Sequence, residues 1–471
     1  MSFVRLFATT LFFLVTISAS ISAECKCIDW VEKISSAELE SIRYVPIPAD
    51  VTAHPFEKRG FVEVPLDYSR ADSPKIKIFY RLLPVRGSTV NDTTKPILVS
   101  INGGPGISSA YGRAVDFDYQ NSDAKQNEND RFKFLSESFR ILMIDQRGTG
   151  FSAPLEPATP PYISPAIINQ YFGPNLQALD HAEVIKKVIP KGEAHFLNGQ
   201  SYGGRLMLHY LAVKDRPTPT GIIFSSSALP FRDGIKASVE RRQSQLTLNL
   251  QLQEKFPDIS VRLDHLREHF RENGFPPESV NHLWMLLGKG PEGVWQEKMV
   301  KKITELQAAN RKELKKFIDE SAEGVSLLNY VLSSAILHPG FTDLTMSEEV
   351  DRLLPLERWM INEQWTLVQV PGGDRVLAEL LNEIDKTPPP EPSLGQLNQV
   401  RRLLYGVETL FTFGEGDAFT PKDTFLPLAQ AIGIKKHSTF TVLPGGHSAL
   451  YWETGHKAVL EWIRDKKLDR H

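Results

Sequence analysis

At residues 199–204 the chain reads Gly-Gln-Ser-Tyr-Gly-Gly. An apolar run, Ala194 to Leu197, precedes this stretch, and an apolar run with helical spacing, Leu206 to Leu211, follows it. This context predicts a strand, a sharp turn and a helix, with Ser201 at the apex of the turn. The flanking glycines favour such a turn because they adopt backbone conformations that other residues avoid.

A serine at the apex of a strand–turn–helix corner is typical of a catalytic nucleophile. The corner lifts the hydroxyl clear of the sheet and leaves the backbone N–H of the next residue, Tyr202, available to an oxyanion. A serine hydroxyl is a weak nucleophile near neutral pH, so it requires a histidine as base and an acid to orient the imidazole. The stretch also occurs by chance, so the interpretation depends on these two partners.

Candidates for both partners follow late in the chain, in the order acid then histidine that the α/β-hydrolase fold requires. Asp417 lies just after one predicted strand, and His447 lies just after the next. Glu415 is the nearest alternative for the acid, and a turn aspartate and a loop histidine are the purely structural interpretations. We predict a serine hydrolase in which Ser201, Asp417 and His447 form the catalytic triad.

A glycine-rich loop supplies the other part of such a site. Residues 102–106 read Asn-Gly-Gly-Pro-Gly and end the strand that begins at Pro96. A loop in this position can present a backbone N–H to a developing oxyanion. We predict Gly104 and Tyr202 as the two donors of the oxyanion hole, with a simple tight turn as the alternative for the loop.

The order of predicted elements indicates the fold class. Strands alternate with helical segments up to residue 226, which predicts a mostly parallel sheet with helices on both faces, the α/β-hydrolase fold. We expect strands at 61–65, 76–83, 96–101, 140–144, 194–197, 221–226, 409–413 and 438–443, and helices at 176–189, 203–213 and 449–466.

A helical insertion interrupts this pattern. From Ser238 through Leu381 the sequence shows helical spacing and almost no strand signal, and a proline-rich break follows. The basic run 301–316 within it has apolar residues at roughly helical spacing, which predicts a solvated amphipathic helix. We expect an N-terminal extension at 24–60, a hydrolase domain made of 61–230 and 401–471, and a helical cap at 231–400 that covers the active site.

The N-terminus carries a predicted targeting signal. Arg5 precedes an apolar run from Leu6 to Ile17, and small residues follow to Ala23. This order predicts a signal peptide at 1–23, whose removal leaves a secreted or periplasmic protein. The apolar run is shorter than the ~20 residues of a spanning helix, so we expect no membrane anchor after cleavage.

The composition gives no reason to expect nucleic acid, a metal ion or a cofactor as a partner. The chain has 54 basic and 57 acidic residues and a net charge of -3, which gives no electrostatic reason to expect nucleic acid. The two cysteines, Cys25 and Cys27, are too close in sequence to build a disulfide scaffold, and no histidine lies near them. We therefore predict no metal and no cofactor, and the oligomeric state stays open.

Together these motifs resemble the prolyl iminopeptidase and tripeptidyl aminopeptidase family of α/β-hydrolase serine peptidases. Five stretches carry the likeness in order: Val64-Pro65-Leu66-Asp67-Tyr68, Asn102-Gly103-Gly104-Pro105-Gly106, Asp145-Gln146-Arg147-Gly148-Thr149-Gly150, the serine stretch, and the segments around Asp417 and His447. The resemblance implies an exported serine exopeptidase that removes N-terminal residues, either proline or short peptides, from peptide substrates. It also implies that residues 145–148 form a structural element beside the active site.

Asn102 departs from this family, which usually begins its glycine loop with histidine. Asparagine there, like the stretch Gly148-Thr149-Gly150-Phe151-Ser152, resembles serine carboxypeptidases, which act from the opposite end of a peptide. Carboxypeptidases resemble one another in a glutamate just before the nucleophile, where this chain has Gln200, and in several disulfides, which two cysteines cannot form. We therefore favour an aminopeptidase and keep a carboxypeptidase as an alternative.

An aminopeptidase must also bind the cationic α-amine of its substrate, which requires a carboxylate in the site. In the family this acid comes from the cap, and Glu363, between Trp359 and Trp365, is the best candidate. Glu357 and a purely structural role for Glu363 remain alternatives. A lipase or esterase would use the same triad. A non-catalytic binding protein on this scaffold is a third class, which the complete set of triad residues disfavours.

Overall fold

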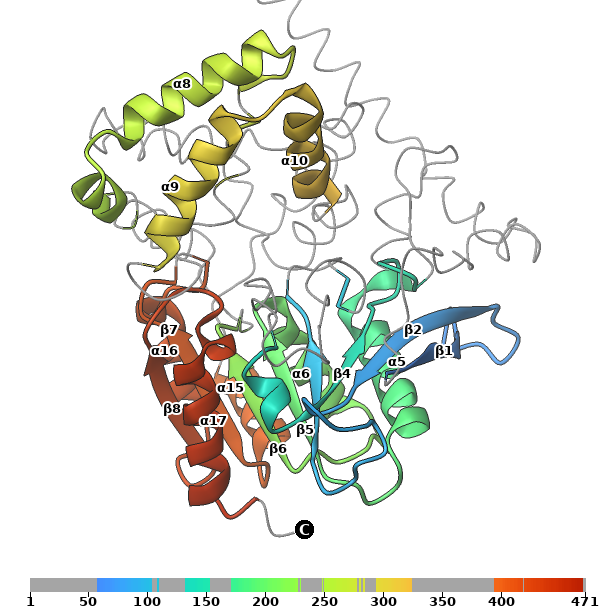
Figure 1. The fold of residues 1–471 in the computed structure, drawn as a ribbon. Helices are drawn as coiled ribbons and strands as arrows, with labels where there is room; N and C mark the ends of the chain where they lie inside the picture. Colours follow the sequence, from blue (N-terminus) through green and yellow to red (C-terminus); the bar gives the residue numbers. More distant parts are fainter. Residues whose placement is uncertain are drawn as a thin grey trace, which may run out of the picture.

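The computed structural model describes residues 57–103, 108–109, 132–152, 171–227, 229, 248, 250–277, 279–280, 283, 294–323, 394–417 and 419–468. Its centre is an eight-stranded sheet in the order β1-β2-β4-β3-β5-β6-β7-β8 (Figure 1). The strands are β1 (Lys58–Pro65), β2 (Lys75–Leu83), β3 (Ile97–Ile101), β4 (Arg140–Ile144), β5 (His195–Gln200), β6 (Gly221–Ser225), β7 (Thr409–Gly414) and β8 (Ser438–Leu443). β2 pairs antiparallel with β1 and β4, and all other pairs are parallel. The predicted mostly parallel sheet is confirmed.

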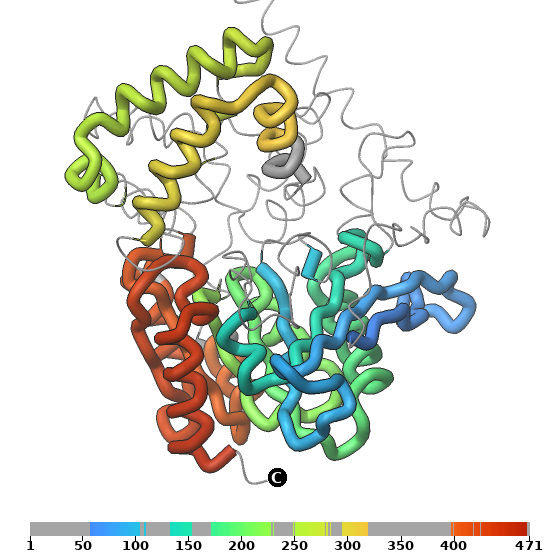
Figure 2. Tube along the Cα trace, viewed as in Figure 1, coloured from blue at the N-terminus to red at the C-terminus, as the bar shows by residue number. Residues whose placement is uncertain are grey.

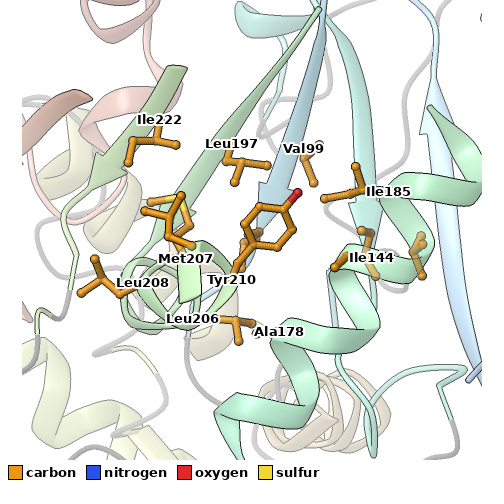
Figure 3. Close-up of a cluster of buried hydrophobic side chains, with 14 of the residues drawn as sticks. Val99, Ile144, Ala178, Ile185, Leu197, Leu206, Met207, Leu208, Tyr210 and Ile222 are labelled. Atoms are coloured by element: carbon orange, nitrogen blue, oxygen red, sulfur yellow. The ribbon is translucent and has the colours of Figure 1, made fainter. Parts of the chain in front are cut away.

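The central strands are apolar because helices cover both faces of the sheet. Alternate residues of β3 divide between two cores: Val99 packs in one and Leu98 in the other. The first core contains α5 (Pro174–Val188), α6 (Tyr202–Ala212), α15 (Leu394–Leu404) and α16 (Lys422–Ile432). Figure 3 shows its centre, where Met207 and Tyr210 of α6 lie against the sheet. The second contains the 3₁₀ helices η2 (Leu135–Glu137) and η5 (Ala449–Tyr451) and α17 (Glu453–Asp465).

Three helices of the insertion lie at one end of the sheet (Figure 1 and Figure 2). They are α8 (Ile259–Glu272), α9 (Val294–Gln307) and α10 (Arg311–Glu323), and their buried faces form a separate apolar core. The ammonium of Lys298 on α9 lies 5.3 Å from the ring centre of Trp452, and Leu248 lies beside Gly416. These contacts place the insertion over the carboxyl ends of the parallel strands, where the predicted acid and base follow β7 and β8.

Most predicted strands and helices are confirmed to within a few residues, but two helices are not as predicted. The basic run 301–316 is divided between α9 and α10, with a break at residues 308–310. The helix predicted at 449–466 begins with the 3₁₀ helix η5, and the extended backbone of Trp452 separates it from α17. In addition, α15 crosses the domain boundary predicted at residue 400 and packs on the hydrolase core.

In the described part of the chain, no helix combines the length and the apolar character that a membrane span requires. The predicted signal peptide, Cys25 and Cys27 lie outside the described residues.

Candidate active site

Ser201 lies at a sharp corner between β5 and α6. Its backbone has φ 54° and ψ −122°, a conformation that non-glycine residues rarely adopt. Its N–H donates to the carbonyl oxygens of Ser225 and Ser226, both at 3.1 Å, which holds the corner against the end of β6. The strained backbone at this one residue is the geometry expected of a nucleophile elbow.

Glycines make the corner sterically possible. A Cβ on Gly199 would lie 2.6 Å from the carbonyl oxygen of Gly203, and a Cβ on Gly203 would collide with the carbonyl oxygen of Ile101. A Cβ on Gly103 would lie 2.7 Å from the Cβ of Ser201. Helix α6 and the start of the glycine loop can therefore approach the serine closely only because these side chains are absent.

Tyr202 contributes its backbone, not its side chain, to this corner. It is the first residue of α6, so its N–H has no acceptor within the helix. Its ring is fully buried, and the hydroxyl donates to the Gln177 side-chain oxygen at 3.0 Å. The N–H at the positive end of α6 is suited to bind an oxyanion beside Ser201.

Asp417 and His447 form the acid–base pair of the site. The Nδ1 atom of His447 lies 3.0 Å from each carboxylate oxygen of Asp417. The ring of Phe419 packs against the imidazole, with 4.9 Å between ring centres. Glu415, the alternative acid, is exposed to solvent. The geometry therefore favours Asp417 as the residue that orients His447.

The Asp417 carboxylate is held in its ionised form. Backbone N–H groups of Phe419 and Thr420 donate to one of its oxygens at 2.8 and 3.0 Å, and the Thr420 hydroxyl donates to the other at 2.6 Å. Burial by itself raises the pKa of Asp417, but the charge and hydrogen bond of His447 and the hydrogen bonds of Thr420 outweigh it and lower the pKa to about 2. Asp417 is therefore an anion at all but strongly acidic pH.

Gln200, the residue before the serine, connects the strand that precedes Ser201 to the loop that carries His447. Its side-chain nitrogen donates to the backbone carbonyl of His447 at 2.9 Å, and the residue is 6% exposed. The glutamine thus joins the end of β5 to the loop that follows β8.

Asn102 closes the glycine loop. Its side-chain nitrogen donates to the carbonyl of Ser108 at 3.1 Å, so it spans the loop from one side to the other. Asp145, fully buried at the end of β4, accepts from the hydroxyl of Ser108 at 2.6 Å and from the N–H of Ser109 at 2.8 Å. These contacts hold the far end of the loop close to the sheet. Gly104 itself lies outside the described residues.

Arg147 has a structural role near the site. Its buried guanidinium forms two hydrogen bonds of 2.6 Å with Asp180 on α5 and others with the carbonyls of Leu66 and Tyr171. Tyr68 also donates to Asp180, at 2.9 Å. Arg147 therefore ties α5 to the chain at the end of β1.

Comparison with known proteins identifies the family of this fold. A family model described as alpha/beta hydrolase fold matches residues 96–454. The chain belongs to this family. Among curated proteins, the hydrolase is 30% identical over 157 residues to a proline iminopeptidase of Aeromonas sobria, and the match covers 32% of this chain and 33% of that protein. The chain thus spans about a third of the length of this relative.

Solved structures similar to the hydrolase include a bromoperoxidase from Bacillus anthracis and an esterase from Exiguobacterium antarcticum. The first has a TM-score of 0.40 and 13% identity, with 86% of this chain and 100% of that chain covered. The second has a TM-score of 0.37 and 14% identity, with 82% of this chain and 96% of that chain covered.

The structure describes some of the predicted site residues and leaves others outside the described ranges. It brings Asp417 and His447 together and sets Ser201 at the elbow, while Glu363, Glu357 and Gly104 lie outside the described residues. In the part of the chain that the structure describes, no group of three or more His, Cys, Asp or Glu side chains is arranged to hold a metal ion.

Thr420 was not predicted as part of the hydrolase's site. The signal for it was the spacing of Asp417 and Thr420, because an aspartate often accepts hydrogen bonds from the backbone two or three residues later. The contacts of Gln200 and Asn102 had no such local signal. The partner of Gln200, His447, lies far away in the sequence, and the partner of Asn102, Ser108, lies on the other side of the glycine loop.

Proposed function

We propose that this hydrolase is an exported serine exopeptidase that removes N-terminal residues, proline or short peptides, from peptides through an acyl-enzyme. The observation that carries the catalytic part is the pairing of His447 with the buried, ionised Asp417 in a fold whose elbow presents Ser201. This arrangement contains the nucleophile, base and orienting acid that acyl transfer requires.

In the proposed reaction, the Ser201 hydroxyl attacks the scissile carbonyl carbon while His447 takes the hydroxyl proton. The resulting oxyanion accepts hydrogen bonds from the backbone N–H groups of Tyr202 and Gly104. Collapse breaks the C–N bond, and His447 gives its proton to the departing amine. A water molecule, deprotonated by His447, then attacks the ester carbonyl, and His447 returns the proton to the Ser201 oxygen as the ester C–O bond breaks. Asp417 stabilises the imidazolium formed in each step.

Two arguments favour release from the amino end. The relative from Aeromonas sobria, named a proline iminopeptidase, supports this class over part of the chain. The position where carboxypeptidases carry a glutamate for the substrate carboxylate is occupied by Gln200, whose amide nitrogen is engaged with His447. We further propose that Glu363 in the cap binds the substrate's α-ammonium group, because a cation in a desolvated site needs an anionic partner.

Serine labelling tests the catalytic part. We expect a fluorophosphonate probe to label the wild-type protein and the labelling to vanish in Ser201→Ala. A matched control is Ser138→Ala, because the Ser138 hydroxyl also lies 3.0 Å from a histidine nitrogen, Nε2 of His456, outside the proposed site. Labelling that persists in Ser201→Ala, or that is lost in Ser138→Ala instead, would refute the assignment of the nucleophile.

Substrate preference tests the exopeptidase part. Aminoacyl amides with a free amine should be cleaved, and the same amides with a blocked amine should be cleaved far more slowly. Short neutral esters measured alongside separate the peptidase from an esterase: a much higher kcat/KM for esters, with no effect of the free amine, would indicate an esterase. Release of C-terminal residues from a peptide library would indicate a carboxypeptidase.

Export is proposed from the predicted signal peptide at 1–23. Expression of the full chain in a secreting host should give an exported protein whose N-terminal sequence begins at Glu24. Retention of the uncleaved chain inside the cell would contradict this part of the proposal.

A further inference from the structure

The distance between nucleophile and base has to be fixed across the sheet. Ser201 follows β5, whereas His447 follows β8, and β6 and β7 lie between these strands. At about 4.8 Å per strand, β8 is roughly 14 Å from β5, so the loop after β8 must return over two strands to reach the serine. A contact between β5 and the backbone of His447 can therefore set how far the histidine lies from the serine.

We propose that Gln200 is a positioning residue that sets the separation of Ser201 and His447. The proposal rests on the proposed function. Gln200 is covalently joined to Ser201, and the carbonyl that accepts its N–H belongs to His447 itself. The 2.9 Å hydrogen bond thus connects the two residues by a short path that involves neither of their side chains.

The same face of β5 supplies two further contacts to the segment after β8. Residues 196, 198 and 200 alternate along the strand and so point to one side of the sheet. The Asn198 side chain donates to the hydroxyl of Tyr451 at 3.1 Å, and the ring of Phe196 packs edge-on against Trp462, with 6.0 Å between centres. Of the three contacts, only that of Gln200 reaches the residue that performs the chemistry. Phe196 and Asn198 secure the segment farther from the reacting atoms.

Burial makes the glutamine contact strong and its loss costly. Gln200 is 6% exposed, and a hydrogen bond shielded from water is electrostatically stronger than one at the surface. Without the donor, the carbonyl of His447 would lose this partner and the loop could shift. A displacement of about 1 Å in catalytic groups can reduce the rate of reaction by about 10²-fold. Substrate binding, which does not depend on this distance, should change little.

Gln200→Met tests the proposal, since methionine keeps the length of the side chain but cannot donate. We expect kcat to fall by about 10- to 100-fold, with KM within about threefold of wild type and fluorophosphonate labelling slowed in proportion to kcat. Tyr451→Phe is the matched control, because it removes one buried hydrogen bond at the neighbouring contact and keeps the ring. It should lower thermal stability by a similar amount and leave kcat within about twofold.

Gln200→Glu adds a second test, the pH dependence of kcat, which should not change if Gln200 has a purely structural role. An ionised glutamate repels the His447 carbonyl, whereas a protonated one donates to it. Burial beside the His447 carbonyl raises the pKa of a carboxyl group at this position, so the kcat of Gln200→Glu divided by that of the wild type should rise as the pH is lowered from about 8 to about 5.5. The same ratio for Gln200→Met should stay flat. Division by the wild-type value at each pH cancels the pH dependence that the variant and the wild type share.

The outcomes separate this proposal from the proposed function. A wild-type protein that the phosphonate does not label would refute the serine hydrolase mechanism itself. A labelled wild type with an unchanged kcat in Gln200→Met would overturn the positioning role alone. Equal losses of kcat in Gln200→Met and Tyr451→Phe, or a flat pH ratio for Gln200→Glu, would also overturn it.

Discussion

Ser201, the proposed nucleophile, has a strained backbone conformation. Its φ of 54° is unfavourable for a side chain with a Cβ, yet the corner is held by hydrogen bonds to the end of β6. The surrounding structure thus maintains a backbone conformation that the serine would not adopt alone. This strain is what presents the hydroxyl at the surface of the sheet.

Asp417 is buried and contacts the His447 imidazole, whereas Glu415 is exposed. We expect Asp417→Asn to lower kcat by around 10⁴-fold, because an amide at this position favours the wrong imidazole tautomer. Glu415→Gln should change kcat by less than about threefold, since its side chain is exposed. Steady-state kinetics with circular dichroism as a check of folding would measure both, and the reverse ranking would transfer the acid role to Glu415.

Individual site residues could be predicted from the sequence where their position after a strand is enough to identify them. Ser201, Asp417 and His447 could be selected because each follows a predicted strand in the order that the fold requires. The contact of Gln200 with His447 could not be predicted, because it joins residues 247 positions apart whose proximity depends on how the loop after β8 returns across the sheet.

A local capping motif explains one of the two helices that were not as predicted. Asn310 accepts from the N–H groups of Lys312 and Glu313, and the Glu313 side chain accepts from the N–H of Asn310. This is a capping box, which starts α10 and interrupts what apolar spacing alone predicted as one helix. The four residues Asn310 to Glu313 carried the signal. By contrast, strands β3 to β7 were predictable because burial on both faces requires continuous apolar runs.

The glycines of the elbow give a prediction for this element. Gly203→Ala should destabilise the protein by about 3 kcal/mol or more, because its Cβ would collide with the backbone of β3. Gly192→Ala is the control: it imposes a side chain at φ +87° with no neighbour within 4 Å, so only the conformational cost of about 1–2 kcal/mol applies. Denaturant unfolding of both variants would measure the difference, and wild-type stability in Gly203→Ala would contradict the close packing of α6 on β3.

The molecule as a whole should be sensitive to mild acid. Burial lowers the pKa of His181 and His456, and it lowers the pKa of His195 and of His209 to about 4 each. Below pH 6.5 the unfolded chain therefore binds more protons than the folded one, so the free energy of unfolding falls as the pH decreases from about 6.5 to about 4. Asp417, whose pKa is lowered, contributes stability that is lost only at more acidic pH, as the pH falls through about 2.

His195 offers the clearest test of this pH dependence. Its Nε2 atom is buried without a hydrogen-bond partner in the described structure, and its pKa of about 4 against 6.5 corresponds to roughly 3 kcal/mol of stability lost on acidification. His195→Gln should unfold with a shallower dependence on pH between about 7 and 4.5, as measured by denaturant titrations at several pH values. The same slope in both proteins would show that His195 does not contribute.

At the scale of the whole chain, the sequence predicted the sheet and a helical insertion, because the change in periodicity is long and sharp. It did not predict that α15 packs on the hydrolase core, since an amphipathic helix does not specify which apolar surface it covers. The contact of Lys298 with Trp452, between two parts of the chain far apart in sequence, was equally beyond local analysis.

The position of the acid and base in the chain also determines when the enzyme becomes active. Strands β1 to β6 and the nucleophile are complete by Ser225, but β7 and β8, which carry Asp417 and His447, are synthesised only after the insertion. During translation the serine is therefore present without its base, and β6 still lacks its neighbour on one side. Under the proposed mechanism, hydrolytic activity begins only when the C-terminal segment docks on β5, so a nascent or incompletely folded chain is inactive.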